Sequence, residues 1–315
     1  MTADLPDEAD DSPDRHADRR DDQGGGGQPI RPDSADAETR NREQYYADLR
    51  TAVSTEESTT VRRFTAEEQA AAEKWDKATE ESRWMWTEYQ RRWPPEERVR
   101  VDRPNDASGS WLGEGGRTLT AEANGRVEAA CDQIADRERE TISPALCAIE
   151  SQDPDRRLIG FEDCLKGRDR IKEKVFDKMK EFVDFSPEEA IASVSDAIRY
   201  TFQYRETHYT QGVWTDIGRL KEQGFELHKL WNAWSDEKYK GINSQWIEQD
   251  TGQRFEVQFH TRISFEAKQL THDAYERLRI HQADKFEQMV LEAFERKVTA
   301  EVPVPPGAAD IPDYP

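Results

Sequence analysis

The sequence lacks the features that mark membrane, secreted and zinc-finger proteins. No window approaches the ~18 consecutive apolar residues of a transmembrane helix, and the N-terminus has neither the basic nor the apolar segment of a secretion signal. The three cysteines are odd in number and have no CxxC spacing, which argues against a disulfide framework and a zinc site. We therefore expect a cytoplasmic protein without membrane association, which would need a route without a Sec signal if it were exported.

Positive charge is also scarce. Lysine and arginine number 45 against 66 aspartate and glutamate residues, which gives a net charge of -21. Because phosphate contacts need clustered basic side chains, this balance argues against non-specific binding of nucleic acid. Any phosphate ligand must therefore meet a local basic patch.

Composition divides the chain into five predicted regions. Residues 1–40 contain twelve acidic residues, five basic residues and no aromatic residue, so they cannot bury enough apolar surface to fold, and we expect a disordered acidic tail. Residues 41–102 form a helical Trp-rich arm, whose aromatic stripe is typical of a packing surface and could serve a protein partner. Residues 103–117 are a linker by their Gly, Pro and Ser content, 118–298 are the main domain, and 299–315 are a Pro-rich tail without a stable fold of its own.

Periodicity predicts an α+β fold with a small mixed β-sheet flanked by helices. Helical spacing covers residues 120–150 and 165–182, and the pattern changes after Pro187. From there the sequence predicts strands at 197–204, 226–234, 239–249 and 254–261, a helix at 212–224, and one long helix at 264–298.

One predicted strand combines two chemistries. In residues 254–261, the apolar Phe255, Val257 and Phe259 alternate with the polar Glu256, Gln258 and His260. A half-exposed strand with a polar outer face is the ordinary explanation. A functional site is the alternative.

A basic stripe precedes this sheet. Lys166, Arg170, Lys174 and Lys178 recur every four residues, so on a helix they share one face. A solvated helix face explains such a stripe, but a polyphosphate ligand would need it too.

Two acidic residues complement the stripe. Asp196 lies just ahead of a strand and Glu256 lies inside a later one. Carboxylates on neighbouring strands can hold a Mg²⁺ ion that also binds substrate phosphate. An aspartate at a strand entrance is also a common turn residue.

The block from Leu165 to Arg279 resembles the RelA/SpoT nucleotidyltransferase family, the alarmone synthetases that move a pyrophosphate from ATP to the ribose 3'-hydroxyl of GDP or GTP. The family motif RxKxxxSxxxK is similar to "CLKGRDRIKEK", which keeps Lys166 and Lys174 and has Cys164 and Arg170 in place of the arginine and the serine. The family motif DxxGIR is similar to "VSDAIR", which keeps Arg199. The family aspartate falls on Val194, so Asp196, two residues later, is the candidate substitute.

Two later motifs extend the resemblance. "KYKGIN" is similar to the acceptor motif and keeps Tyr239 and Lys240, with Asn243 where the family has a histidine. "EVQFHT" is similar to ExQxRT, with Glu256, Gln258 and Thr261 kept and His260 in place of the arginine, and His272 keeps the family spacing. The departures are typical of an outlying toxin, phage-associated or actinobacterial branch.

The resemblance implies a nucleotidyltransferase-like fold and a Mg²⁺-dependent pyrophosphokinase that uses ATP and a purine nucleotide acceptor. It implies catalytic roles for Glu256, Gln258 and Arg199, with Glu256 and Asp196 as the metal ligands. Lys166, Arg170 and Lys174 would bind the ATP phosphates, and Tyr239, Lys240, Asn243, His260 and His272 the acceptor. Two alternatives stay open: the same transfer onto a tRNA 3' end, as in a toxin, and a catalytically degenerate nucleotide-binding or interaction module. No HD hydrolase motif is present, so we expect no alarmone hydrolysis.

Overall fold

The computed structural model describes residues 44–45, 47–49, 51, 65–93, 103, 105–279 and 283–315. The predicted acidic tail, residues 1–40, lies outside the described residues, as do residues 94–102 and most of residues 41–64 of the predicted Trp-rich arm. Within the described residues, no helix is long and apolar enough to cross a membrane.

A five-stranded mixed sheet forms the centre of the molecule, as the sequence predicts. Its strands are β3 (Arg156–Ile159), β4 (Arg199–Tyr204), β5 (Phe225–Asn232), β6 (Ile242–Glu248) and β7 (Arg254–Thr261), in the order β3-β4-β7-β6-β5. β4 and β7 run parallel, whereas the other neighbouring pairs are antiparallel. The parallel pair therefore brings the predicted Arg199 strand and the predicted Glu256 strand side by side.

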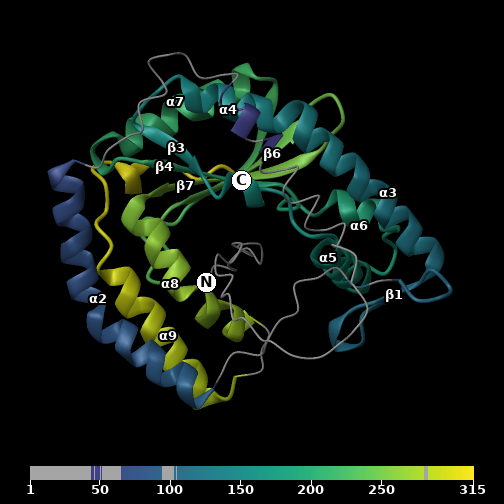
Figure 1. Ribbon diagram of the computed structural model, residues 1–315, viewed down its shortest axis with the longest axis horizontal. Helices are drawn as coiled ribbons and strands as arrows, with labels where there is room; N and C mark the ends of the chain where they lie inside the picture. The colour runs from purple at the N-terminus through teal and green to yellow at the C-terminus, as the bar shows by residue number, and fades with distance from the viewer. Residues whose placement is uncertain are drawn as a thin grey trace, which may run out of the picture.

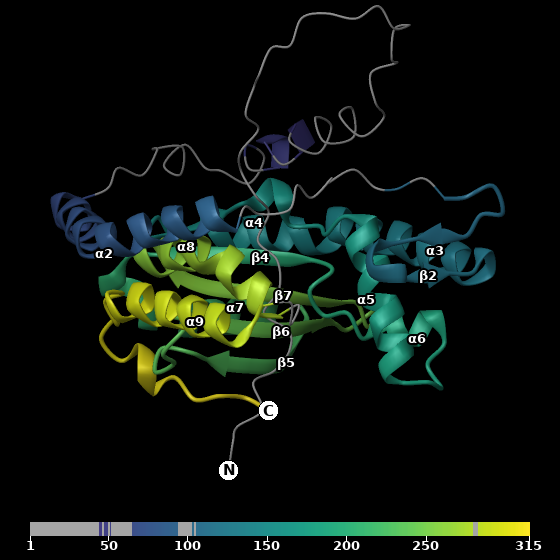
Figure 2. The ribbon, with the colours of Figure 1, turned by 90° about the horizontal axis from the view of Figure 1, so that it is seen from below.

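Helices cover both faces of this sheet (Figure 1). They are α2 (Ala66–Arg92), α3 (Ala121–Arg137), α4 (Ser143–Ser151), α5 (Arg168–Glu181), α6 (Pro187–Ala192), α7 (Tyr209–Glu222), α8 (Arg262–Arg279) and α9 (Lys285–Ala300). A π-helical turn, Glu138–Ile142, joins α3 to α4. α4 and α7 lie on one side of the sheet, and α8, α9 and α2 lie on the other, while α5 and α6 lie beyond one end of it. Figure 2 shows α9 and α8 in front of the strands from a second direction.

The apolar core lies on the α4 and α7 side of the sheet. Alternation along β4 and β7 directs Tyr200, Phe202, Phe255, Val257 and Phe259 to this side, and all are buried. The rings of Phe202 and Phe259 stack across the parallel pair, with centroids 6.3 Å apart. The same alternation directs the polar residues of β7 to the opposite face.

The prediction of one helix over residues 264–298 is wrong. The segment forms α8 and α9, which pack against each other as a helical hairpin. Asp284 begins α9, and its side chain accepts a hydrogen bond from the backbone N–H of Glu287. This cap ends the run, because an aspartate that accepts from the first helical turn starts a new helix.

The Trp-rich helix α2 packs against α9. The rings of Trp86 and Phe294 stack at 4.8 Å, and the hydroxyl of Tyr89 donates to Glu287 at 2.6 Å. Lys297 of α9 lies within ion-pair distance of Glu81 of α2. The aromatic stripe of α2 is thus a packing surface within the chain.

The segments predicted as linker and tail both contact the domain. In the linker, β1 (Trp111–Leu112) pairs with β2 (Thr118–Leu119), and the buried Trp111 donates from its indole N–H to Asp169 of α5 at 2.8 Å. In the tail, Ile311 is buried, and the backbone of Tyr314 pairs with that of Leu230. The glycine and proline residues of these segments therefore mark turns and do not separate the segments from the main domain. The domain boundaries themselves stay predictions.

Candidate active site

The polar face of the sheet is assembled by strand register. In the parallel pair, Arg199 lies opposite Glu256 and Thr201 opposite Gln258. On the other side of β7, Asn243 of β6 also lies opposite Gln258. Because alternate residues of a strand point to the same side, these side chains share one face.

This polar face is buried. Glu256 and Gln258 are each 1% exposed, and His260 is fully buried, so a half-exposed strand with a solvated face is the wrong explanation. Lys268 of α8 covers the face and donates to Gln258 Oε1 at 2.6 Å. Gln258 in turn donates from Nε2 to Glu256 Oε1. The two catalytic candidates on β7 are therefore held in one hydrogen-bonded row.

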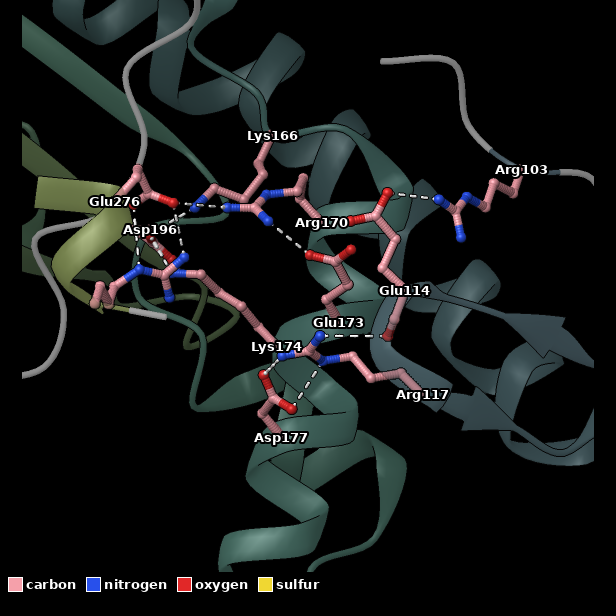
Figure 3. Close-up of polar contacts among 11 residues, drawn as sticks. Arg103, Glu114, Arg117, Lys166, Arg170, Glu173, Lys174, Asp177, Asp196 and Glu276 are labelled. Carbon is pink, nitrogen blue, oxygen red and sulfur yellow. Dashed lines mark hydrogen bonds and ion pairs between the residues drawn. The ribbon is translucent and has the colours of Figure 1, made fainter. Parts of the chain in front are cut away.

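Asp196 is the centre of the basic cluster (Figure 3). Its Oδ2 lies 2.7 Å from Lys166 Nζ, 2.6 Å from Lys174 Nζ and 3.1 Å from Arg199 Nη2. Burial alone would raise the pKa of Asp196, but these three charges outweigh it and hold the pKa well below the usual range. Asp196 is therefore ionised throughout the neutral range.

Arg199 joins the two carboxylates of the site. Its Nη2 contacts Asp196, and its Nε lies 3.0 Å from Glu256 Oε1. Burial raises the pKa of Glu256, Arg199 acts in the opposite direction, and the charge of Asp196 adds to the increase. A carboxyl group with a raised pKa is a stronger proton acceptor once it is ionised.

These residues fit a metal ion only in company with an anionic ligand. Lys166, Lys174, Arg199 and Lys268 outnumber the two acids, Asp196 and Glu256. Within the described residues, no group of three or more His, Cys, Asp or Glu side chains is placed to hold a metal. Mg²⁺ is commonly held by one or two carboxylates together with substrate phosphates, and this arrangement fits that mode rather than an all-protein site.

The acceptor candidates form a second hydrogen-bonded group beside the first. The hydroxyl of Tyr239 donates to Asn243 Oδ1 at 2.8 Å and lies 2.8 Å from His260 Nε2, while His260 Nδ1 lies 2.9 Å from Ser264 Oγ. Burial holds the pKa of His260 well below its usual value, so the ring is neutral. Gly241 permits this approach, because a Cβ on it would lie 2.7 Å from His260 Cε1, and its φ is 150°.

The remaining predicted residues have different placements. Lys240 turns its ammonium group to the backbone carbonyls of Trp234 and Asp236, so it braces its own loop. Arg170 pairs with Glu173 at 2.7 Å on the same helix. His272 is half-buried on α8, four residues after Lys268.

Sequence reasoning named His272 but missed the two other residues on the same face of α8, Lys268 and Glu276. Lys268, His272 and Glu276 recur every four residues and therefore share one helix face. Lys268 contacts Gln258, and Glu276 lies 3.9 Å from Arg170. The spacing was visible in the sequence, but it had no meaning without knowing which face of α8 meets the sheet.

Comparison with known proteins gives structural neighbours only. No protein-family model and no curated protein matches this sequence. Among solved structures, the chain is similar to a GTP pyrophosphokinase family protein from Streptococcus pneumoniae, with 14% identity, a TM-score of 0.39, and coverage of 58% of this chain and 90% of that chain. It is also similar to small alarmone synthetase 1 from Bacillus subtilis, with 11% identity, a TM-score of 0.37, and coverage of 56% and 91%. The structure of that synthetase bound to its product pppGpp gives 9% identity, a TM-score of 0.32, and coverage of 57% and 86%.

Proposed function

We propose that this chain is a pyrophosphokinase-type transferase that moves the terminal diphosphate of ATP to the 3'-hydroxyl of a purine nucleotide. The observation that carries the proposal is the convergence of Lys166, Lys174 and Arg199 on one buried carboxylate, Asp196, next to Glu256. Buried cations of this density are what a polyphosphate requires, and they contrast with the chain's net charge of -21.

The proposed reaction joins the acceptor oxygen to the β-phosphorus of ATP and releases AMP. Negative charge spreads over the phosphoryl oxygens as the bonds exchange, and Lys166, Lys174 and Arg199 would neutralise it. Mg²⁺, when bound with the nucleotide by Asp196 and Glu256, would add to this neutralisation. The catalysis thus needs positioned charge rather than a covalent intermediate.

Glu256 is the proposed proton acceptor. Its raised pKa suits it to take the proton that the attacking 3'-hydroxyl loses. Gln258, fixed between Lys268 and Glu256, would orient that hydroxyl. These roles use the row of polar contacts that runs from Lys268 of α8 through Gln258 to Glu256 on β7.

The acceptor nucleotide would lie against the Tyr239 loop. The ring of Tyr239 stacks with Trp231 at 5.7 Å, and its hydroxyl is fixed by Asn243 and His260. An aromatic ring held in this way can support a purine base by stacking. The acceptor would thus be set by a loop distinct from the ATP phosphate cluster.

The direct test incubates the protein with labelled ATP, Mg²⁺, and either GDP, GTP, ADP or total tRNA. Release of AMP with a labelled 3'-diphosphate nucleotide supports the proposal, and Glu256→Gln should abolish it. The exposed Glu226→Gln on β5 is the matched control and should keep full activity. Label on tRNA would favour the tRNA transferase instead, and nucleotide binding without AMP release would favour a binding module.

A further inference from the structure

An acidic residue from α8 reaches the basic stripe of α5. Glu276 is 3% exposed, and its Oε2 lies 3.0 Å from Arg279 Nη2 and 3.9 Å from Arg170 Nη2. Figure 3 shows the Glu276 carboxylate beside Asp196 and Lys166 and pointing toward Arg170. The contact therefore joins α8 to the helix that carries Arg170 and Lys174.

The stripe already has carboxylate partners within the protein. Lys166 and Lys174 pair with Asp196, and Arg170 pairs with Glu173 on its own helix. Glu276 differs from these acids because it comes from α8, so its carboxylate approaches Arg170 from the α8 side. A phosphate that binds Arg170 from that side must displace it.

We propose that Glu276 is an internal competitor of the nucleotide phosphates and sets the affinity of the site for polyphosphate. This inference rests on the proposed function, in which Lys166 and Lys174 bind ATP phosphates, and it extends that binding to Arg170 of the same stripe. Carboxylates and phosphates bind the same guanidinium donors, so each contact that Glu276 makes is one that the ligand must replace. A buried carboxylate beside a bound phosphate also adds like-charge repulsion.

The competition gives the site two properties. Without a nucleotide, Glu276 lies between the positive charges of Arg170 and Arg279 and offsets part of both. After transfer, AMP has fewer phosphate groups with which to hold the cations, so Glu276 would compete for Arg170 more effectively and favour the release of AMP. Glu276 thus determines the affinity for the ligand and does not contact the reacting atoms in the proposed reaction.

The test measures binding of inorganic tripolyphosphate and of a non-hydrolysable ATP analogue by calorimetry. Glu276→Gln keeps the shape of the side chain and removes its charge, so we expect binding to tighten about tenfold. Damage to the fold would weaken binding, so a gain in affinity separates competition from a structural role. Glu266→Gln on the same helix, where Glu266 pairs with Arg262 at 2.7 Å, is the matched control and should leave affinity unchanged.

A second variant keeps the inference testable if Glu276→Gln does not fold. Glu276→Asp keeps the charge but shortens the side chain by one methylene, so its contact with Arg170 should weaken and polyphosphate affinity should rise by about two- to threefold. Unchanged or weaker binding in the variants that fold overturns the inference.

Lys174→Ala separates this inference from the proposed function. If Lys174→Ala weakens polyphosphate binding while Glu276→Gln leaves it unchanged, only the role of Glu276 is wrong. If the wild-type protein binds neither ligand, the proposed function and this inference both fail.

Discussion

The side chains on both faces of β7 are buried, but the two faces are stabilised by different kinds of contact. Phe255 and Phe259 bury apolar area against other aromatic rings, whereas Glu256, Gln258 and His260 are equally buried and are satisfied by polar partners. Burying a polar group costs free energy unless the group is hydrogen-bonded. The polar face therefore depends on Lys268, Tyr239 and Ser264, which supply the hydrogen-bond partners of Gln258 and His260. One face thus stabilises the fold, and the other keeps charged groups ready for a ligand.

The largest effect should come from neutralising the polar face at Glu256. For Glu256→Gln we expect AMP release to fall by at least about a hundredfold, since the proton acceptor is lost. Stability should stay or rise, because the folded-state pKa of Glu256 is raised: its stabilising contribution is complete below the unfolded-state pKa and is lost as pH increases. Enzyme assays and urea unfolding at pH 7 check both parts, and a stable variant with full activity would contradict the assignment.

The apolar face should show the opposite profile. Phe259→Ala removes a fully buried ring that contacts Phe202 and Tyr204, so the free energy of unfolding should fall by about 3–5 kcal/mol. Phe286→Ala, on a ring that is 63% exposed, is the control and should change it by less than about 0.5 kcal/mol. Denaturant titrations measure both, and a small effect at Phe259 would show that its face is not the core.

A buried acid with few cationic neighbours sharpens the contrast with Asp196. Glu295 of α9 is buried, and burial raises its pKa to about 7 against the opposing charge of Lys238. Its raised pKa means that its stabilising contribution is complete below the unfolded-state value and disappears as pH rises through about 7. We expect Glu295→Gln to be about 2–3 kcal/mol more stable than the wild type at pH 8 and nearly equal at pH 4.5.

Unfolding curves at the two pH values test this difference. The exposed Glu301→Gln, beyond the end of α9, is the control and should change the free energy of unfolding by less than about 0.5 kcal/mol. An equal effect of Glu295→Gln at both pH values would mean that the carboxyl group does not titrate in this range.

The smallest effect should come from a single hydroxyl on the polar face. Tyr239→Phe keeps the ring but leaves Asn243 and His260 without that partner, so we expect a loss of about 1 kcal/mol in stability. The acceptor KM should rise while ATP affinity stays the same, because the Tyr239 loop is separate from the basic cluster. Steady-state kinetics, with each substrate varied in turn, measures both KM values. A change confined to the KM for ATP would contradict the placement of Tyr239 in the acceptor subsite.

Local patterns predicted the strands well because alternation and turn residues are written directly in the chain. The alternation around Phe255 to His260 identified β7, and Gly224 marked the end of α7. Patterns did not reveal that both faces of β7 are buried, since burial depends on α8, which follows it and folds back. The pairing of Arg199 with Glu256 likewise depends on a parallel register between strands more than 50 residues apart.

Other predictions failed where tertiary contacts override composition. The helical periodicity continues through both α8 and α9, so only the cap at Asp284 marks the break. The Gly-rich segment before β2 looked like a linker, although Trp111 anchors it to α5. Lys240 was assigned to the acceptor from its place in a motif, but its ammonium group turns back to the loop carbonyls.

The pairing of Tyr314 with Leu230 also bears on solubility. β5 is an edge strand, and an open edge offers unpaired backbone groups that another chain can extend into a shared sheet. Tyr314 and Leu230 exchange both backbone hydrogen bonds at 2.9 Å, and Asp313 accepts the N–H of Asn232. The tail thus occupies the backbone groups of Leu230 and the N–H of Asn232, which another chain would otherwise need for pairing at this end of the β5 edge.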